Sequence, residues 1–252
     1  MNITSEVVAI SGAAGRIGSS LVRFLLEKNF RVIAGDINKK KINILKKEIN
    51  SENVCFFLGD LTKYKSIDNF IKIGIKNFGE INSAINCAYP KDDWGKRFED
   101  IKQNSLNNNI VNHLGGAIIF AQRFAKYFLK NKRGNLINFS SIQGIAQPKF
   151  HHYKNLKMGS PIEYSAIKSG IISITKYLAK YYKYKNLRFN CISPGGIKDK
   201  QPKLFIKRYK ASCLNKGLLD PEDLFSLVYF LLSNKSQYIN GQNIIIDDGW
   251  SL

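Results

Sequence analysis

The first 26 residues place a glycine-rich turn between an apolar stretch and a helical pattern. Val7 to Ile10 are apolar and rich in β-branched side chains, and leucine and valine recur at helical spacing from Leu21 to Leu26. Glycines between a strand and a helix let the backbone approach a pyrophosphate, whose charge is met by the helix N-terminus. An ordinary glycine-rich loop is the alternative. The candidate dinucleotide-binding residues of this turn are Ser11, Gly12, Gly15, Arg16, Ile17 and Gly18.

A carboxylate follows the second predicted strand. Residues 31–35 form a short apolar stretch that ends at Asp36, about 20 residues beyond the glycines. At this position a carboxylate accepts hydrogen bonds from the adenosine ribose hydroxyls and repels a 2′-phosphate. Arg16 acts weakly in the opposite direction, because its cation would attract that phosphate. We therefore expect NAD rather than NADP as the cofactor.

Further strand-like stretches alternate with helical segments along the chain, at 54–58, 81–85, 135–139, 187–192 and 243–246. This alternation predicts a Rossmann-type, doubly wound α/β fold, in which one parallel sheet has helices on both faces and ligands at the carboxyl ends of its strands. Asp60 at one such end either bonds the adenine or caps the following helix. The cofactor candidates at these ends are Asp60, Leu61, Asn86, Ala88, Pro194, Gly195 and Ile197.

The length of 252 residues suits a single domain spanning 1–252. No linker, low-complexity tract or internal repeat interrupts the chain, and no apolar run reaches the ~18 residues that suggest a membrane span. The first residues lack the basic start, apolar stretch and cleavage site of a signal peptide. We expect a cytoplasmic protein with no membrane partner.

The net charge of +20 would suit a nucleic-acid-binding protein. The positive residues, however, are mostly lysines spread over the whole length, and runs such as 39–41 and 46–47 fall on predicted helix faces. Solvated surface is the favoured interpretation, and no nucleic-acid partner is expected. The cysteines are scattered and the three histidines lack zinc-binding spacing, so we expect reduced thiols and no metal.

Tyr164 and Lys168 lie four positions apart in a predicted helix and therefore share one face. A phenol ionises near pH ~10 in water, and a nearby ammonium favours the phenolate. The pair is a candidate general acid and base, although an amphipathic surface helix would show the same spacing by chance. Ser140 and Ser141 follow the strand at 135–139, either as hydrogen-bonding groups of a site or as strand-end caps.

Taken in order from residue 7 to about residue 249, these motifs resemble the short-chain dehydrogenase/reductase family. The residues that carry the resemblance are the glycine turn, Asp36, Asp60, 86–88, Ser141, Tyr164, Lys168, 194–195 and 240–242. The resemblance implies that Tyr164 is the catalytic acid and base, and that Lys168 lowers its pKa and holds the nicotinamide ribose. Tyr164 and Lys168 are both cofactor-binding candidates as well. Ser141 would hydrogen-bond the reacting oxygen, with Ser140 as its neighbour. Asn112 would position a water in a proton relay, and the asparagines at 107–109 are alternatives to it.

Simple chemistry agrees with those implied roles. Moving a hydride between nicotinamide and a carbinol carbon leaves the oxygen to gain or lose one proton. A positioned acid and base together with a donor aimed at the oxygen is sufficient, and no metal is needed. We therefore expect an NAD-dependent oxidoreductase that interconverts a secondary alcohol and a ketone on a small-molecule substrate.

Three smaller features depart from the common pattern of that family. Gly15 comes three positions after the first glycine of the turn rather than four, and Arg16 takes the usual place. Tyr89 and Pro90 are bulky and should reshape the edge of the nicotinamide pocket. Asp199 stands near the place of a threonine that bonds the nicotinamide carboxamide, so the group that holds the amide is open.

The largest departure is the interval of 23 positions between Ser141 and Tyr164, which is longer than the family usually has. The extra segment, around 149–161, must start and end beside the catalytic pair, so we expect it to wall the substrate site. Cations at a cleft favour an anionic ligand such as a phosphate or carboxylate. Abundant lysine throughout the chain is the alternative explanation. The cations are Lys149, Lys154 and Lys157 in the segment, with Lys91, Lys96 and Arg97 after Ala88.

A closer resemblance, to bacterial flagellin-modification oxidoreductases found with sugar-nucleotide and nonulosonic-acid pathways, rests on 86–90, 97–100, 113–116, 161–170 and 247–249. It implies a sugar substrate, phosphorylated or nucleotide-linked, in surface-glycan synthesis. The rivals are reduction of a lipid-type or polyketide-type ketone and a non-catalytic NAD-binding regulatory protein. The family resemblance also implies a homo-oligomer, a dimer or tetramer, for which the helix at 171–178 and the last strand are the expected contact surfaces.

Overall fold

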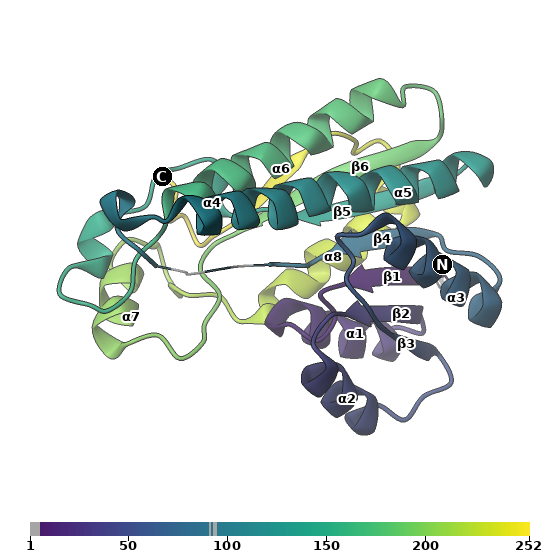
Figure 1. Ribbon diagram of the computed structural model, residues 1–252, viewed down its shortest axis with the longest axis horizontal. Helices are drawn as coiled ribbons and strands as arrows, with labels where there is room; N and C mark the ends of the chain where they lie inside the picture. The colour runs from purple at the N-terminus through teal and green to yellow at the C-terminus, as the bar shows by residue number, and fades with distance from the viewer. Residues whose placement is uncertain (1–5, 91, 93–94) are drawn as a thin grey trace.

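The computed structural model describes residues 6–90, 92 and 95–252. Seven parallel strands form one sheet in the order β3-β2-β1-β4-β5-β6-β7 (Figure 1). Each predicted strand is present with small shifts at its ends, and the predicted doubly wound α/β fold is confirmed. The strands are β1 Val7–Ser11, β2 Arg31–Asp36, β3 Val54–Leu58, β4 Ser83–Asn86, β5 Gly134–Phe139, β6 Leu187–Pro194 and β7 Asn243–Ile246.

Helices pack on both faces of the sheet. The α-helices of the chain are α1 Arg16–Glu27, α2 Lys39–Glu48, α3 Tyr64–Phe78, α4 Gln103–Asn109, α5 Gly116–Lys130, α6 Ile162–Tyr181, α7 Lys203–Lys210 and α8 Phe225–Leu232. Successive strand residues point to opposite faces. On β1, Val8 and Ile10 pack in the core that includes α1 and α8, whereas Val7 and Ala9 pack in the core that includes α3 and α5. Figure 1 shows α5 and α6 side by side, and a further apolar cluster joins them.

Three phenylalanines anchor α5 to the sheet. Phe120, Phe124 and Phe128 recur every four positions, so they lie on one helix face, and all three are buried. Their ring centroids are 4.6 and 5.7 Å apart along the helix. Burying each ring contributes roughly 1.5–3 kcal/mol. This packing also sets the position of the segment that leads into α5, Ile110–Gly115, which is a π-helix.

The strand order reverses beside β1, which has β2 on one side and β4 on the other. In the parallel register Ser11 pairs with both Gly35 and Asn86. The glycine turn after β1 therefore meets Asp36 at the end of β2 and the loop that follows β4. A crevice at such a reversal is where doubly wound sheets bind ligands.

The face of α6 that was expected to contact a second copy of the chain is largely buried within the protein itself. Ile171 and Ile172 of α6 are buried against the same chain, because this side of α6 packs on α5 and β6. The exposed apolar residues of α6 are instead Ile162, Tyr177 and Tyr181. These three exposed side chains therefore replace Ile171 and Ile172 as the candidate surface for contact with a second copy.

Within the described ranges, no helix combines the length and apolar character needed to cross a membrane. No three His, Cys, Asp or Glu side chains of that part of the chain converge as metal ligands would. The four cysteines are free thiols. Burial raises the pKa of Cys55 and of Cys213 to about 11, which keeps both protonated and unreactive at neutral pH.

Candidate active site

Tyr164 lies in the first turn of α6 and is joined to Ser141 by a side-chain hydrogen bond. The chain leaves the sheet at the end of β5 and brings Ser141 across to the helix. Burial raises the pKa of Tyr164, and the bond to Ser141 offsets this in part. At neutral pH the phenol is therefore a neutral group with a proton to donate.

Lys168 lies one turn further along α6. Its Nζ is 5.5 Å from the centroid of the Tyr164 ring and donates to the carbonyl of Phe139 at 3.0 Å. Burial lowers the pKa of Lys168 to about 8. Burial is the largest influence on the Tyr164 pKa, so the role of Lys168 in lowering that pKa, which the family resemblance implies, stays a prediction.

The two serines after β5 have different partners. Ser140 Oγ donates to the carbonyl of Lys168 at 2.8 Å, which ties the end of β5 to α6. Ser141 Oγ accepts from the N–H of Gln143 at 3.2 Å and also bonds Tyr164. Ser140 thus holds the helix in place, whereas Ser141 is the hydroxyl that reaches the phenol.

Asn112 lies in the π-helical stretch between α4 and α5 and lines the cleft at the point where the strand order reverses. A widened helical turn of this kind often occurs at functional sites. Two of the three alternative asparagines have other partners. Asn109 donates to the carbonyl of Asp92 at 2.9 Å and accepts from its N–H at 2.7 Å, and Asn108 donates to the Asp92 carboxylate at 3.2 Å. This favours Asn112 over its neighbours as the site residue.

A cleft of about 690 Å³ opens where the strand order reverses. Its volume is within the range of roughly 300–1,000 Å³ usual for ligand pockets. The predicted residues that line it are Gly12, Gly15, Arg16, Ile17, Gly18, Asp36, Asp60, Leu61, Ala88, Asn112 and Ile197. Sequence reasoning missed Ile37, Asn38, Lys41, Gly59, Thr62 and Gln201, although most are close sequence neighbours of predicted residues.

The glycine turn has the close backbone packing that a dinucleotide site requires. Gly12 has φ +65°, and a Cβ added to it would lie 2.7 Å from the carbonyl oxygen of Cys87. A Cβ on Gly18 would lie 2.2 Å from the carbonyl oxygen of Gly12. Both positions therefore need glycine, and the N-terminus of α1 is left open to the cleft, where its N–H groups can bind phosphate. The residues present fit a nicotinamide dinucleotide.

Six predicted cofactor residues do not line this cleft: Ser11, Asn86, Pro194, Gly195, Tyr164 and Lys168. Ser11 donates to the side-chain oxygen of Asn86 at 2.7 Å, and both are buried beneath the turn. Gly195 donates to the carbonyl of Ile246 at 2.8 Å in the sheet. Ser11, Asn86 and Gly195 therefore support the floor of the cleft, because their polar groups bond residues of neighbouring strands. The ring of Tyr89, which lines the cleft, lies next to Tyr164 and Lys168 and separates both from it.

Two carboxylates organise the adenosine end of the cleft. Asp36 accepts from the N–H of Ala14 at 2.9 Å and from that of Asn38 at 2.8 Å. Asp60 accepts from the N–H of Thr62 at 3.0 Å and from its hydroxyl at 2.7 Å. Asp60 therefore braces the turn before α3 and lines the cleft, but it does not cap α3, whose N-cap residue is Lys63 and which has no side-chain cap.

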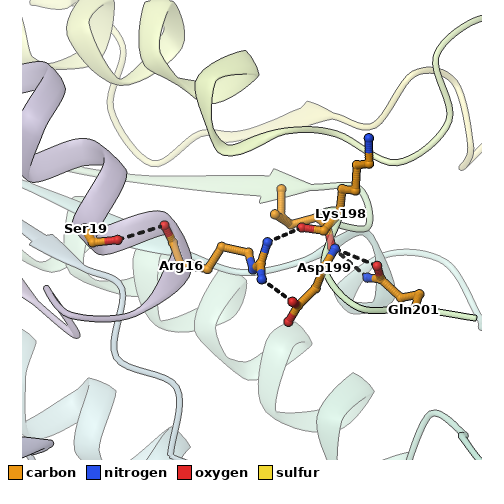
Figure 2. Close-up of polar contacts among 6 residues, drawn as sticks. Arg16, Ser19, Lys198, Asp199 and Gln201 are labelled. Atoms are coloured by element: carbon orange, nitrogen blue, oxygen red, sulfur yellow. Dashed lines mark hydrogen bonds and ion pairs between the residues drawn. The ribbon is translucent and has the colours of Figure 1, made fainter. Parts of the chain in front are cut away.

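An ion pair crosses the mouth of the cleft. Figure 2 shows Arg16, at the start of α1, reaching Asp199 and the carbonyl of Lys198 on the loop after β6. Arg16 and Asp199 were candidates for separate reasons, the first as part of the glycine turn and the second as a replacement for the usual threonine. Their contact joins segments that are far apart in the sequence, so no local pattern predicts it.

The ring of Tyr89 separates the cleft from Tyr164 and Lys168, the candidate catalytic pair. Its ring centroid lies 5.6 Å from that of Tyr164 and 5.0 Å from that of His113, and Lys168 Nζ is 5.5 Å from it. Burial and the charge of Lys168 lower the pKa of His113 to about 2, so this imidazole is neutral. Tyr89 and Pro90 line the cleft, as expected for residues at its nicotinamide edge.

The long segment before Tyr164 forms one side of a second cavity, of about 910 Å³. Residues 95–99 and 147–148 contribute to it, together with most of 150–162. Gln143 donates to the hydroxyl of Tyr153 at 3.4 Å and accepts from Ser160, while its N–H bonds Ser141. The segment is therefore coupled to Ser141 through Gln143. Lys91, which was predicted to add charge here, lies outside the described residues.

Aromatic packing holds the segment on the body of the protein. His152 is buried among Phe205, Tyr209 and Trp250, with ring centroids 5.6 to 6.1 Å away. Its Nε2 is 2.9 Å from the hydroxyl of Ser212. Burial lowers the pKa of His152 to about 4, so the ring is neutral in the folded protein. The wall of the second cavity is thus anchored to α7 and to the end of the chain.

The family model described as enoyl-(acyl carrier protein) reductase matches residues 12–251. This match includes the glycine turn, Ser141, Tyr164 and Lys168 within one alignment. The chain belongs to the short-chain dehydrogenase/reductase family. It is therefore an NAD(P)-dependent oxidoreductase, and the family resemblance found in the sequence is confirmed.

Known members of the short-chain dehydrogenase/reductase family align with nearly all of the chain. Post-translational flagellin modification protein A of Campylobacter coli is 37% identical over 255 residues, covering 99% of this chain and 100% of that protein. A 3-oxoacyl-(acyl-carrier-protein) reductase of Thermotoga maritima is 28% identical over 258 residues, covering 99% of each. The crystal structure of a short chain dehydrogenase from Leptospira borgpetersenii with bound NAD+ has a TM-score of 0.88 at 31% identity, covering 100% of this chain and 94% of that one.

Proposed function

We propose that this protein transfers a hydride between NAD and the carbinol carbon of a small polar substrate, interconverting a secondary alcohol and a ketone. The observation that carries the proposal is that the bonded pair Ser141 and Tyr164 has neighbours lining both cavities. Tyr89, which packs on Tyr164, lines the cofactor cleft. Tyr153, whose hydroxyl accepts from the Gln143 side chain while the Gln143 N–H bonds Ser141, lines the second cavity. A proton donor at this junction can serve a substrate beside a dinucleotide.

The side chains have distinct tasks in this reaction. When bound, NAD accepts or returns the hydride, and the substrate oxygen must then lose or gain one proton. In the direction of reduction the phenol of Tyr164 donates that proton while the Ser141 hydroxyl hydrogen-bonds the same oxygen. The ammonium of Lys168 stabilises the resulting phenolate, and Asn112 holds a water that returns the proton. Oxidation uses the same groups in reverse order.

The cleft favours NAD over NADP. Asp36 places a carboxylate where a ribose 2′-phosphate would lie, and it is held there by two backbone N–H groups. Arg16, the nearby cation that could attract that phosphate, is paired with Asp199. The Leptospira borgpetersenii structure, with its bound NAD+, supports the same choice.

Asp36→Asn is expected to lower the ratio of kcat/KM for NAD to that for NADP at least about tenfold, a difference of about 1.4 kcal/mol. The change removes the negative charge and keeps the shape of the side chain, so repulsion of the 2′-phosphate falls. Steady-state kinetics with both cofactors measure the ratio. Glu52→Gln, which removes an exposed charge outside the cleft, should leave it unchanged. A ratio unaffected by Asp36→Asn would show that this carboxylate does not select the cofactor.

The proposed substrate is a sugar with an anionic group, used in surface-glycan or flagellin modification in the cytoplasm. The Campylobacter coli relative supports the pathway. The second cavity supports the charge, because four basic residues and one acidic residue line its described part: Lys96, Arg97, Lys154, Lys157 and Glu99. Cations gathered at a cavity attract phosphate or carboxylate.

The direct test is NADH formation or consumption with a matched panel containing a sugar, its phosphate, its nucleotide-linked form and a 3-oxoacyl thioester. We expect the charged sugars to turn over fastest. Lys154→Glu combined with Lys157→Glu should raise KM for them several-fold with little change in kcat, because these cations meet the charge away from the reacting carbon. Lys46→Glu combined with Lys47→Glu, the same charge change on α2, is the control. An unchanged KM would refute the anionic site.

Reduction of an acyl-carrier-bound ketone is the second candidate. The description of the matching family model and the Thermotoga maritima relative favour it. In the same panel, a thioester that turns over faster than every sugar derivative would replace the carbohydrate proposal with this one.

We also propose that the protein is a homo-oligomer. Tyr177 and Tyr181 of α6 are 64% and 67% exposed, and Ile245 on the edge strand β7 is 46% exposed. Exposed apolar side chains on a helix and on a sheet edge are suited to contact between copies. Light scattering on the purified protein gives the mass that tests this proposal.

A further inference from the structure

The ion pair at the mouth of the cofactor cleft joins the two sides of the cleft. Arg16 lies on the side formed by the glycine turn, and Asp199 lies on the side formed by the loop after β6. The guanidinium contacts both the Asp199 carboxylate and the carbonyl of Lys198, so it holds the loop at two points (Figure 2). A contact of this kind can restrict movement of the loop after β6 away from the glycine turn.

Local structure explains why Arg16 and Asp199 find each other. Arg16 is the first residue of α1, where the positive end of the helix dipole disfavours a cation, and the first turn holds no acidic residue. The loop that presents Asp199 is braced from within. Gln201 accepts from the N–H of Asp199 at 2.6 Å and donates to the carbonyl of Ile197 at 2.8 Å. The carboxylate is therefore held at the mouth by a supported loop.

The charges in the cleft make this pairing important for a dinucleotide. Asp36, Asp60 and Asp199 all line the cleft, and a pyrophosphate would add two negative charges. An unpaired carboxylate at the mouth would repel the ligand. Because Arg16 neutralises Asp199, the loop can lie over the ligand without that repulsion.

We propose that the Arg16–Asp199 ion pair is a positioning pair that holds the loop at 197–201 over the bound dinucleotide and slows its release. The proposal rests on the cofactor site proposed above and is independent of the substrate. The two side chains are 44% and 50% exposed, so the effect is that of a surface ion pair. Such a pair is expected to change the release rate roughly two- to five-fold.

Release of NADH, followed by nicotinamide fluorescence after mixing with excess NAD+ in a stopped-flow instrument, tests the proposal. Asp199→Asn should raise the release rate roughly two- to five-fold with little change in the association rate. Arg16→Gln should raise it at least as much. The double variant should release NADH no faster than Arg16→Gln, because Asp199 has no partner once Arg16 is gone. Asp199→Glu, which keeps the charge, should remain closer to the original protein.

The chain contains a matched control. Arg23 and Glu48 form an ion pair with the same exposed fractions, 44% and 50%, and neither residue lines the cleft. Arg23→Gln and Glu48→Gln should leave NADH release unchanged. Release that is unaltered or slower in Asp199→Asn would overturn the proposal, since Asp199 would then act only as a repulsive charge. Failure of the unaltered protein to bind NADH would overturn the cofactor site as well, which distinguishes the two proposals.

Discussion

Tyr164→Phe is expected to lower kcat about 10²- to 10⁴-fold, the contribution typical of a positioned general acid. The substitution removes only the hydroxyl that bonds Ser141 and leaves a ring to pack against Tyr89. The variant should therefore fold and still bind NADH. Steady-state turnover, thermal unfolding and NADH fluorescence on one preparation separate loss of chemistry from loss of structure.

Tyr177→Phe is the matched control for this change. Tyr177 lies on the same helix and is 64% exposed, so its hydroxyl should contribute nothing to turnover. Turnover that survives Tyr164→Phe intact would remove Tyr164 from the mechanism. A protein that binds NADH and turns over no member of the substrate panel would instead favour a regulatory NAD-binding role.

Gly18→Ala is expected to weaken NADH binding at least about tenfold, or about 1.4 kcal/mol, and to lower the unfolding temperature. The new Cβ would lie 2.2 Å from the carbonyl oxygen of Gly12 and 2.9 Å from Cα of Ala13. These are backbone atoms, which cannot rotate aside, and overpacking of this kind typically costs about 1–3 kcal/mol. The N-terminus of α1 must move away from the turn, and its N–H groups move with it. NADH titration and thermal unfolding measure both effects.

Gly115→Ala provides the comparison for Gly18→Ala. Gly115 has helical angles of φ −59° and ψ −43°, and the nearest atom to an added Cβ is the carbonyl oxygen of Ile110 at 3.8 Å. Alanine there should leave stability unchanged or raise it by up to about 1 kcal/mol. If Gly18→Ala bound NADH as well as the original protein did, the assignment of the pyrophosphate to this turn would be wrong.

Most of the fold could be predicted because its signals are local. The stretch from Val7 to Leu26 contains a β-branched run, a glycine turn and a helical repeat within one short segment. Repetition of strand and helix then leaves few topologies, since crossovers between parallel strands are right-handed. Strand ends were less certain, as at 81–85, which the structure shows as Ser83–Asn86. Hydrogen bonds to neighbouring strands decide those ends.

The positions of candidate site residues were predictable where they depend only on spacing along one helix. Helical periodicity places Tyr164 and Lys168 on one face, and the structure has both beside Tyr89. The Tyr164 pKa was not predictable in the same way. Spacing suggested that it falls, whereas burial raises it, and burial depends on everything that packs around the phenol.

Local sequence patterns are enough to specify the sheet, the glycine turn with Asp36 beside it, and the shared face of Tyr164 and Lys168. Each of these follows from backbone geometry over a few neighbouring residues. The bond between Ser11 and Asn86, the pairing of Arg16 with Asp199, and the link from the long segment through Gln143 to Ser141 appear only in the folded protein. These contacts join segments that are far apart in the sequence, and the packing of the whole chain brings those segments together.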